Sequence, residues 1–224
     1  MKPPRFAVVA CAVLLSIPMS AQEAPAKPAK PEKPKLTAME RAQGWKFLFD
    51  GGSLSDWRGY GQNKVPANWT VAEGWLTNAG GTALVSEEEF TDFELQFDWK
   101  AEEDGICEVY LRSSEDAAEP DGLLVELAGP SGMGSNGGLT PLWRTITPQP
   151  GLWHRTKVTV YGNQVEHWVD GDRVLTYLVD SPDWRKAVAG SRFNSIKGYG
   201  SLREGRLVLA GKGGSFRNIK IRRL

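Results

Sequence analysis

The sequence is poor in histidine and cysteine, with two of each among 224 residues. One cysteine, Cys11, lies in an apolar N-terminal run, so a chain that loses this run keeps only Cys107. A lone cysteine excludes both an internal disulfide and a cysteine-based metal site. The two histidines, His154 and His167, stand in separate segments, which makes a histidine-rich metal site hard to build. Stability must therefore come from a core of apolar side chains.

An excess of either charge is also missing, because 27 Lys and Arg balance 27 Asp and Glu. No basic stripe follows residue 35, so we expect no nucleic-acid partner. Beyond residue 22 no apolar segment reaches the roughly 20 residues that a membrane-spanning helix needs. The composition thus favours a globular protein without a transmembrane segment after its N-terminal region.

The N-terminal region predicts export. In residues 1–22, Lys2 and Arg5 precede an apolar run that ends in small residues, which is the pattern of a cleaved signal peptide. An uncleaved membrane anchor is the alternative, although the run is short for one. Residues 23–41 are rich in Pro, Ala and Lys and predict an extended linker. Residues 42–224 form the single predicted domain, in a periplasmic or extracellular location.

Short segments with a period of two run through this domain. In "FELQFDWK", residues 93–100, apolar and polar side chains alternate strictly, as they do in "CEVYLR" and "QVEHWV". Such strands predict antiparallel sheets packed face to face. Asp170-Gly171 predicts a tight hairpin turn, and Ser181 followed by Pro182 predicts the start of a helix. The glycine-rich segment 129–138 predicts a mobile loop.

Several motifs resemble the 3-keto-disaccharide hydrolase family. They are "GWKFLFDGGSLSDWRGY", "NWTVAEGWL", "GNQVEHWVDGDRV", "SPDWRKAVAGSRF" and "FRNIKIRRL", in order between about residues 44 and 222. The resemblance implies a concanavalin-like jelly-roll β-sandwich of two antiparallel sheets. It also implies cleavage of glycosides that are already oxidised at carbon 3. The ketone acidifies the hydrogen on carbon 2, so the site needs a base, and hydrogen-bond donors or a divalent metal for the enolate.

The site motifs depart from the family pattern. Where the family has Glu, Gln and Asp along one strand and its end, this chain has Leu124, Glu126 and Gly129. The family's Gln-Asp-His-Gly falls on residues 210–213, where Lys212 replaces the histidine. A carboxylate–histidine pair is therefore missing there, so the resemblance supports the fold more strongly than the site.

If the polar faces of these strands line one concave groove, the groove holds most of the candidate site. The predicted catalytic residues are Glu126, Glu108 and Lys212, and the predicted substrate-binding residues are Arg112, Tyr110, Trp143 and Asp98. Glu126 is the predicted base, Arg112 matches a groove residue of the family, and Trp143 is the predicted sugar platform. A divalent metal held by Glu108, Glu126 and water is the one cofactor that these residues suggest. The alternative is an ordinary solvated outer face, since exposed Glu and Arg need no special reason.

His167 shares a strand face with Val165 and Val169, which predicts a buried, hydrogen-bonded structural histidine. His154 begins a strand and is also predicted to be structural. The sequence therefore predicts an exported hydrolase of 3-keto-glycosides, with a small sugar or other carbohydrate as its partner. The alternative is a carbohydrate-binding or scaffold domain that has kept the sandwich and lost turnover.

Overall fold

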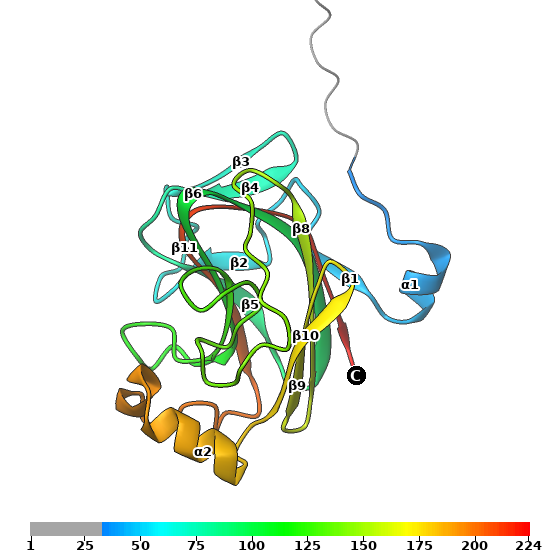
Figure 1. Cartoon of the computed structure of the whole chain (residues 1–224). Coiled ribbons are helices and arrows are strands. Elements are labelled where there is room, and N and C mark those ends of the chain that lie inside the picture. The colour runs from blue at the N-terminus through cyan, green and yellow to red at the C-terminus, as the bar shows by residue number, and fades with distance from the viewer. Residues whose placement is uncertain (1–32) are drawn as a thin grey trace, which may run out of the picture. The chain divides into compact units, whose positions relative to one another are not determined.

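Alternating apolar side chains produce a fold dominated by strands. The computed structural model describes residues 33–224, so the predicted signal peptide and most of the predicted linker lie outside the described residues. The strands are β1 Lys46–Phe49, β2 Trp57–Gly59, β3 Trp69–Ala72, β4 Trp75–Asn78, β5 Leu84–Phe90, β6 Phe93–Ser113, β7 Leu123–Ala128, β8 His154–Tyr161, β9 Gln164–Val169, β10 Asp172–Leu178 and β11 Gly205–Arg223. The helices are α1 Ala38–Ala42, α2 Pro182–Ala189 and the 3₁₀ helix η1 Arg192–Ser195 (Figure 1). All strand pairs are antiparallel, which confirms the predicted all-β class.

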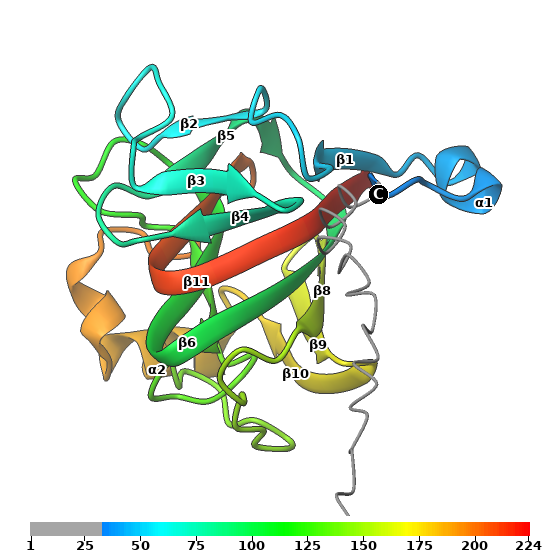
Figure 2. The ribbon, with the colours of Figure 1, turned by 90° about the horizontal axis from the view of Figure 1, so that it is seen from above.

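Two very long strands, β6 and β11, pair with each other from Phe93 opposite Arg223 to Ser113 opposite Arg206. They double back together at a shared corner (Figure 2). The first half of β6 pairs with β8 and its second half pairs with β7. The first layer therefore contains β10, β9, β8 and β4, and the second contains β7, β5 and β2. The predicted sandwich is present, but its two sheets are joined into one hydrogen-bonded sheet.

The core lies between the two layers. Phe93, Leu95, Phe97 and Trp99 point inward from the first half of β6 and are completely or almost completely buried. From the second half, Cys107, Val109 and Leu111 are fully buried in the same apolar cluster. Cys107 is free, as expected for a lone cysteine, and burial raises the pKa of its thiol. Removing this apolar surface from water supplies the main favourable term in folding.

A stack of aromatic rings connects strand β10 of the first layer with strand β7 of the second. The Tyr177 ring stacks on Trp184 of α2 at 5.0 Å, Trp184 stacks on Tyr199, and Tyr199 stacks on Phe193 of η1 at 4.5 Å. The Tyr199 hydroxyl accepts a hydrogen bond from the backbone N–H of Leu124 in β7. The predicted helix is present, with Ser181 as its N-cap. Its buried Trp184 is one of the stacked rings.

The glycine-rich segment 129–138 is a loop, as predicted, but it packs against the sandwich instead of projecting into solvent. Met133, Ser135 and Asn136 are buried, and Ser135 pairs with Glu126 of β7 as an isolated bridge. A Cβ atom at Gly134 would lie within 2.9 Å of side-chain atoms of Val169 and Val174. The glycines therefore let the backbone pack closely against β7, β9 and β10.

Both histidines are buried and hydrogen-bonded, which agrees with the structural interpretation. His167 is fully buried and its Nδ1 lies 2.7 Å from the Gly134 carbonyl oxygen, to which it must donate. Burial lowers the pKa of His167 to about 4, although the hydrogen bond to Gly134 opposes the shift. His154 begins β8 and pairs with the Asp170 carboxylate at 2.8 Å.

The N-terminal part of the described chain contacts the sandwich. Residues 33–41, assigned to the linker from composition, include the start of α1, which is capped by Thr37. Glu40 of this helix forms an ion pair with Lys220 of β11. Among residues 33–224, none of the helices is both long and apolar enough to cross a membrane.

The buried His167 predicts that the free energy of unfolding decreases as the pH is lowered. The unfolded chain takes up a proton near pH 6.5 and the folded chain only near pH 4, so the unfolded state binds more protons between these values. Lowering the pH from 7 to 5 should therefore cost about 2 kcal/mol of unfolding free energy through this group. Urea titrations at both pH values should show that His167→Gln loses less unfolding free energy between pH 7 and pH 5 than the wild type does. His154→Gln is the control, and an undiminished loss in His167→Gln would contradict the account.

The corner of β11 depends on glycine. Gly211 has a φ of +108°, and a Cβ atom there would lie 1.9 Å from the Ile106 carbonyl oxygen. Gly171 also has a positive φ, but its Cβ position is open. Gly211→Ala should lower the unfolding free energy by about 3 kcal/mol or more, against about 1 kcal/mol for Gly171→Ala. Chemical denaturation measures both, and equal losses would show that the corner tolerates a side chain.

Candidate functional site

The bend in β6 separates residues that alternation alone placed in one groove. Asp98 lies on the outer face of the first layer, where its carboxylate accepts hydrogen bonds from Arg155 at 2.7 Å and Asn218 at 2.7 Å. Burial tends to raise the pKa of Asp98, but these two donors outweigh it and the pKa lies below its ordinary value. The expectation that Asp98 shares a groove with Glu108 and Glu126 is therefore corrected, because they project from opposite layers.

Arg112 is also placed differently from expectation. Its φ of +51° interrupts the strand alternation, and its buried guanidinium donates to the carbonyl oxygens of Thr91 and Gly162 and to Asp92. These acceptors lie in the β5–β6 and β8–β9 turns of the chain. Arg112 therefore connects two turns, and none of its hydrogen-bond partners is another candidate residue.

Trp143 and Lys212 lie apart from the other candidates as well. Trp143 is 58% exposed, its backbone N–H donates to the Val174 carbonyl of β10, and the Arg173 guanidinium lies 4.8 Å from its ring centroid. Lys212 is exposed at the corner opposite Ile106 of β6. A Cβ atom at Gly80 would lie 3.1 Å from its side chain, so Lys212 runs along the β4–β5 loop.

Three of the predicted residues do come together. Glu108 and Glu126 are direct partners across β6 and β7, so their side chains share one face. The Tyr110 hydroxyl donates to Oε2 of Glu108 at 2.9 Å. Burial and the Glu108 charge raise the pKa of Tyr110, so this phenol stays protonated at neutral pH. Two carboxylates and a phenol donor thus form the centre of the candidate site.

Glu126 is the enclosed member of this group. Only 2% of its surface is exposed, and its Oε1 accepts a hydrogen bond from the backbone N–H of Ser131. Its carboxyl carbon would lie 2.7 Å from a Cβ atom at Gly129. Glu126 therefore occupies the space into which any side chain at position 129 would project.

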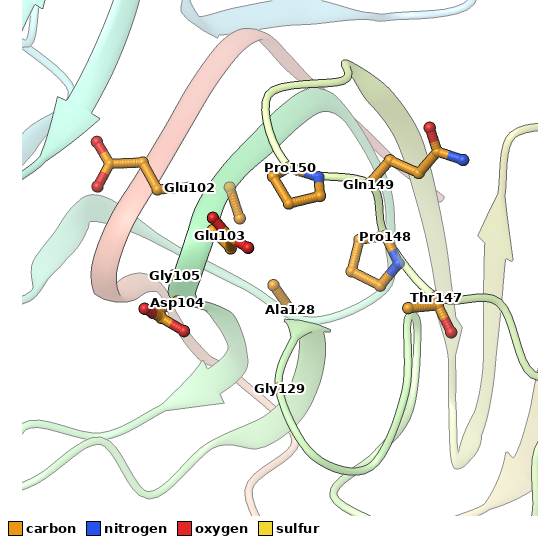
Figure 3. A pocket seen from close by; sticks show the side chains of 11 residues that line it. Glu102, Glu103, Asp104, Gly105, Ala128, Gly129, Thr147, Pro148, Gln149 and Pro150 are labelled. Atoms are coloured by element: carbon orange, nitrogen blue, oxygen red, sulfur yellow. The ribbon is translucent and has the colours of Figure 1, made fainter.

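A pocket of about 350 Å³ lies directly beside Gly129, at the bend of β6. In Figure 3, Glu103 and Asp104 lie on one side of this pocket, Pro148 and Pro150 on the other, and Glu102 points away. Glu102 instead faces Gly213 of β11. The pocket thus borders position 129, one of the positions at which the chain departs from the family pattern, whereas residues 210–213 do not line it.

Sequence reasoning missed some residues around this site. The charge of Arg192 in η1 acts on Tyr110 and lowers its pKa, against the larger effect of burial. Arg192 lies in the quoted motif "SPDWRKAVAGSRF", but nothing in that motif indicates its proximity to β6. The run Glu102-Glu103-Asp104 was visible as three consecutive acidic residues, and only the bend shows that part of it borders a pocket.

The candidate residues fit a metal ion poorly. Across residues 33–224, no group of three or more His, Cys, Asp or Glu side chains is placed to hold a metal. Glu108 and Glu126 supply only two carboxylates, and each already accepts a hydrogen bond. We therefore assign no step to a metal.

Solved structures with the same fold exist. A crystal structure of a glycosyl hydrolase candidate from Parabacteroides distasonis superimposes with a TM-score of 0.79 and 23% identity, covering 86% of this chain and all of that one. A second from the same organism has a TM-score of 0.62 and 21% identity, covering 80% and 99%. At these identities the likeness shows the fold alone.

A curated relative and a family model connect the chain to sugar chemistry. The chain is 26% identical to a 3-keto-disaccharide hydrolase of Bacteroides thetaiotaomicron, over 70% of this chain and 66% of the relative. It therefore spans slightly less than two thirds of that relative's length. The model of the 3-keto-alpha-glucoside-1,2-lyase-like domain matches residues 44–222, which contain all the motifs that carried the resemblance except the last two residues of the final one. The chain belongs to the 3-keto-alpha-glucoside-1,2-lyase-like domain family.

Proposed function

We propose that this chain is an exported hydrolase that cleaves glycosides carrying a ketone at carbon 3 of the sugar. Family membership and the name of the curated relative support this substrate class. The Glu108–Glu126 pair supports a site for acid–base chemistry. Glu126 packs against Gly129, which lines the pocket, although neither carboxylate lines it directly. Export is proposed from residues 1–22, and N-terminal sequencing of the secreted protein tests it, with a new terminus near residue 22 as the expected result.

The reaction needs a base more than a nucleophile. The ketone stabilises the carbanion formed when a carboxylate removes the hydrogen from carbon 2. The bond between carbon 1 and the glycosidic oxygen then breaks, and the leaving oxygen takes up a proton. Addition of water to the resulting unsaturated ketone completes the hydrolysis. Proton transfer of this kind requires a carboxylate held in a fixed position at the pocket.

The position of the Glu126 carboxylate is the observation that carries the proposal. The resemblance places the family's Asp at position 129 and its Gln at position 126. Here the Glu126 carboxyl group lies within 2.7 Å of the place where a Cβ atom at Gly129 would be. The chain therefore provides a carboxylate at nearly the same place from position 126 in β7, three residues earlier in the sequence. We assign Glu126 as the base on this ground.

Glu108 and Tyr110 support that base. Glu108 lies directly opposite Glu126, and Tyr110 holds Glu108 through its hydroxyl. Arg192 of η1 lies near enough for its charge to lower the pKa of Tyr110, and a cation is suited to stabilise the negative charge of an enolate. The single Tyr110 proton is already donated to Glu108, so the phenol positions that carboxylate.

A carbohydrate-binding domain without turnover is the second candidate function. The enclosure of Glu126 favours it, because a base must reach the hydrogen that it removes. The replacement of the family's histidine by Lys212 also favours it, since Lys212 lies along the β4–β5 loop. Turnover of a purified 3-keto-disaccharide distinguishes the two functions directly, because a binding domain forms no product.

The assignment of the base predicts a specific loss of activity. Glu126→Gln should lower kcat by about 100-fold or more, because the amide cannot take up the proton. The amide oxygen can still accept the hydrogen bond from Ser131, so the unfolding free energy should change little. Product formation from a 3-keto-disaccharide and urea denaturation measure the two effects.

Glu204→Gln is the matched control, since Glu204 is exposed and lies outside the site. It should retain wild-type turnover. Full activity in folded Glu126→Gln would remove Glu126 as the base.

A further inference from the structure

The outer face of the first layer is distinct from the candidate active site. Its side chains project from β6, β8, β9 and β11, opposite to the buried Phe93, Leu95 and Phe97. Cross-strand partners share a face, so the registers of these strands define its membership. We call it the basic face; its charged strand residues are Lys100, Arg155, Lys157, Arg217, Lys220 and Arg222, with Glu94, Asp98 and Glu166.

Six cations and three carboxylates leave an excess of three positive charges on the basic face. Two residues beside the face also carry charge: Glu40 of α1 pairs with Lys220, and Arg173 of β10 pairs with Glu166. Their negative and positive charges cancel, so the excess is unchanged. The complete chain has no net charge. The excess is therefore a local property of this layer, and it favours an anionic ligand.

Two of these cations are held by aromatic rings rather than by carboxylates. The Lys100 Nζ lies 5.0 Å from the ring centroids of both Trp75 and Trp153. The Lys157 Nζ lies 4.4 Å from the ring centroid of Trp168. Among residues 33–224, neither lysine has a carboxylate within ion-pair distance. Cation–π contacts position both ammonium groups and leave their charge available.

The aromatic rings continue the basic face at both ends. Trp75 lies in β4 at one side, and at the other side the Arg173 guanidinium lies 4.8 Å from the exposed ring of Trp143 and 5.6 Å from Trp168. From β4 to β10 the layer has five strand spacings, or about 24 Å. This is long enough to contact several sugar residues. An exposed indole suits the apolar face of a sugar ring, as amphipathic aromatic side chains do at other interfaces.

From these observations we propose that the basic face is a second, non-catalytic binding site for an acidic polysaccharide. Carboxylate or sulfate groups pair with Lys100, Lys157 and the surplus arginine charge around Asp98. The three carboxylates already pair with Arg222, Arg155 and Arg173. The indole rings favour the glycan, because they suit the apolar faces of sugar rings. The site would hold the protein on a polymer while the pocket acts elsewhere.

Binding of polygalacturonate to the purified protein tests this proposal. Heparin serves as the sulfated probe, dextran as the neutral one and oligo-dT as the nucleic acid. We expect binding to polygalacturonate or heparin, none to dextran, weaker binding to oligo-dT, and loss of affinity as salt is raised. No binding to either acidic glycan, or tighter binding to oligo-dT, would overturn the proposal.

Charge-matched variants locate the site. Lys100→Glu combined with Lys157→Glu should weaken glycan binding by about tenfold or more, because both free ammonium groups are lost. Lys64→Glu combined with Lys186→Glu makes the same change in net charge at exposed positions outside the basic face. The control pair should keep most of the affinity, and equal losses would show that only overall charge matters.

Two further measurements separate sugar recognition and catalysis from charge. Trp143→Ala preserves every charge, so a several-fold loss of glycan binding is expected from the lost ring surface. Unchanged binding would show that the Trp143 ring does not contact the sugar, and would contradict the proposed recognition of a glycan. Turnover of a 3-keto-disaccharide should be unaffected in Lys100→Glu/Lys157→Glu, since neither lysine forms a hydrogen bond with Glu108 or Glu126. Glycan binding can therefore fail or succeed independently of the proposed hydrolysis.

Discussion

The continuous pairing of β6 with β11 is the constraint on which the rest of the structure depends. Each strand runs through both layers, and the two bend together where Gly211 and Gly213 adopt positive φ values. The bend turns one alternating pattern into two inner faces that meet in a single core. It also sends the polar side chains of the two halves to opposite sides of the molecule.

This division explains why the chain carries two polar surfaces of different character. The second half of β6 presents Glu108 and Tyr110 beside Glu126 of β7, and Glu126 packs against Gly129, which lines a pocket. The first half presents Asp98 among arginines on a face with surplus positive charge. One side is suited to acid–base chemistry, and the other is suited to holding an acidic polymer.

Much of the fold could be predicted from the sequence. Alternation in residues 93–100 predicted which side chains are buried, and Asp170-Gly171 and Ser181-Pro182 predicted a hairpin and a helix that are both present. These features depend on neighbouring residues, so local patterns are sufficient. The face of His167 was also predictable, since it follows from the phase of a single strand.

The candidate site was less predictable because it depends on contacts between distant segments. Nothing local indicates that β6 bends, so Asp98 and Glu108 were assigned to one groove. The φ of Arg112 breaks the alternation, and its carbonyl partners come from two distant turns. Packing against β9 and β10 orders a glycine-rich segment whose composition alone predicted mobility.

The central claim is that Glu126 supplies from β7 the carboxylate that the family pattern places at position 129. The most direct measurement is turnover of a 3-keto-disaccharide by Glu126→Gln and by Glu126→Gln combined with Gly129→Asp. The second variant restores the family pattern at both positions; because Gln is as large as Glu, the side chain at position 126 must move aside to admit the new aspartate. We predict that it regains a large part of the activity lost in Glu126→Gln. A folded double variant as inactive as Glu126→Gln would contradict the account.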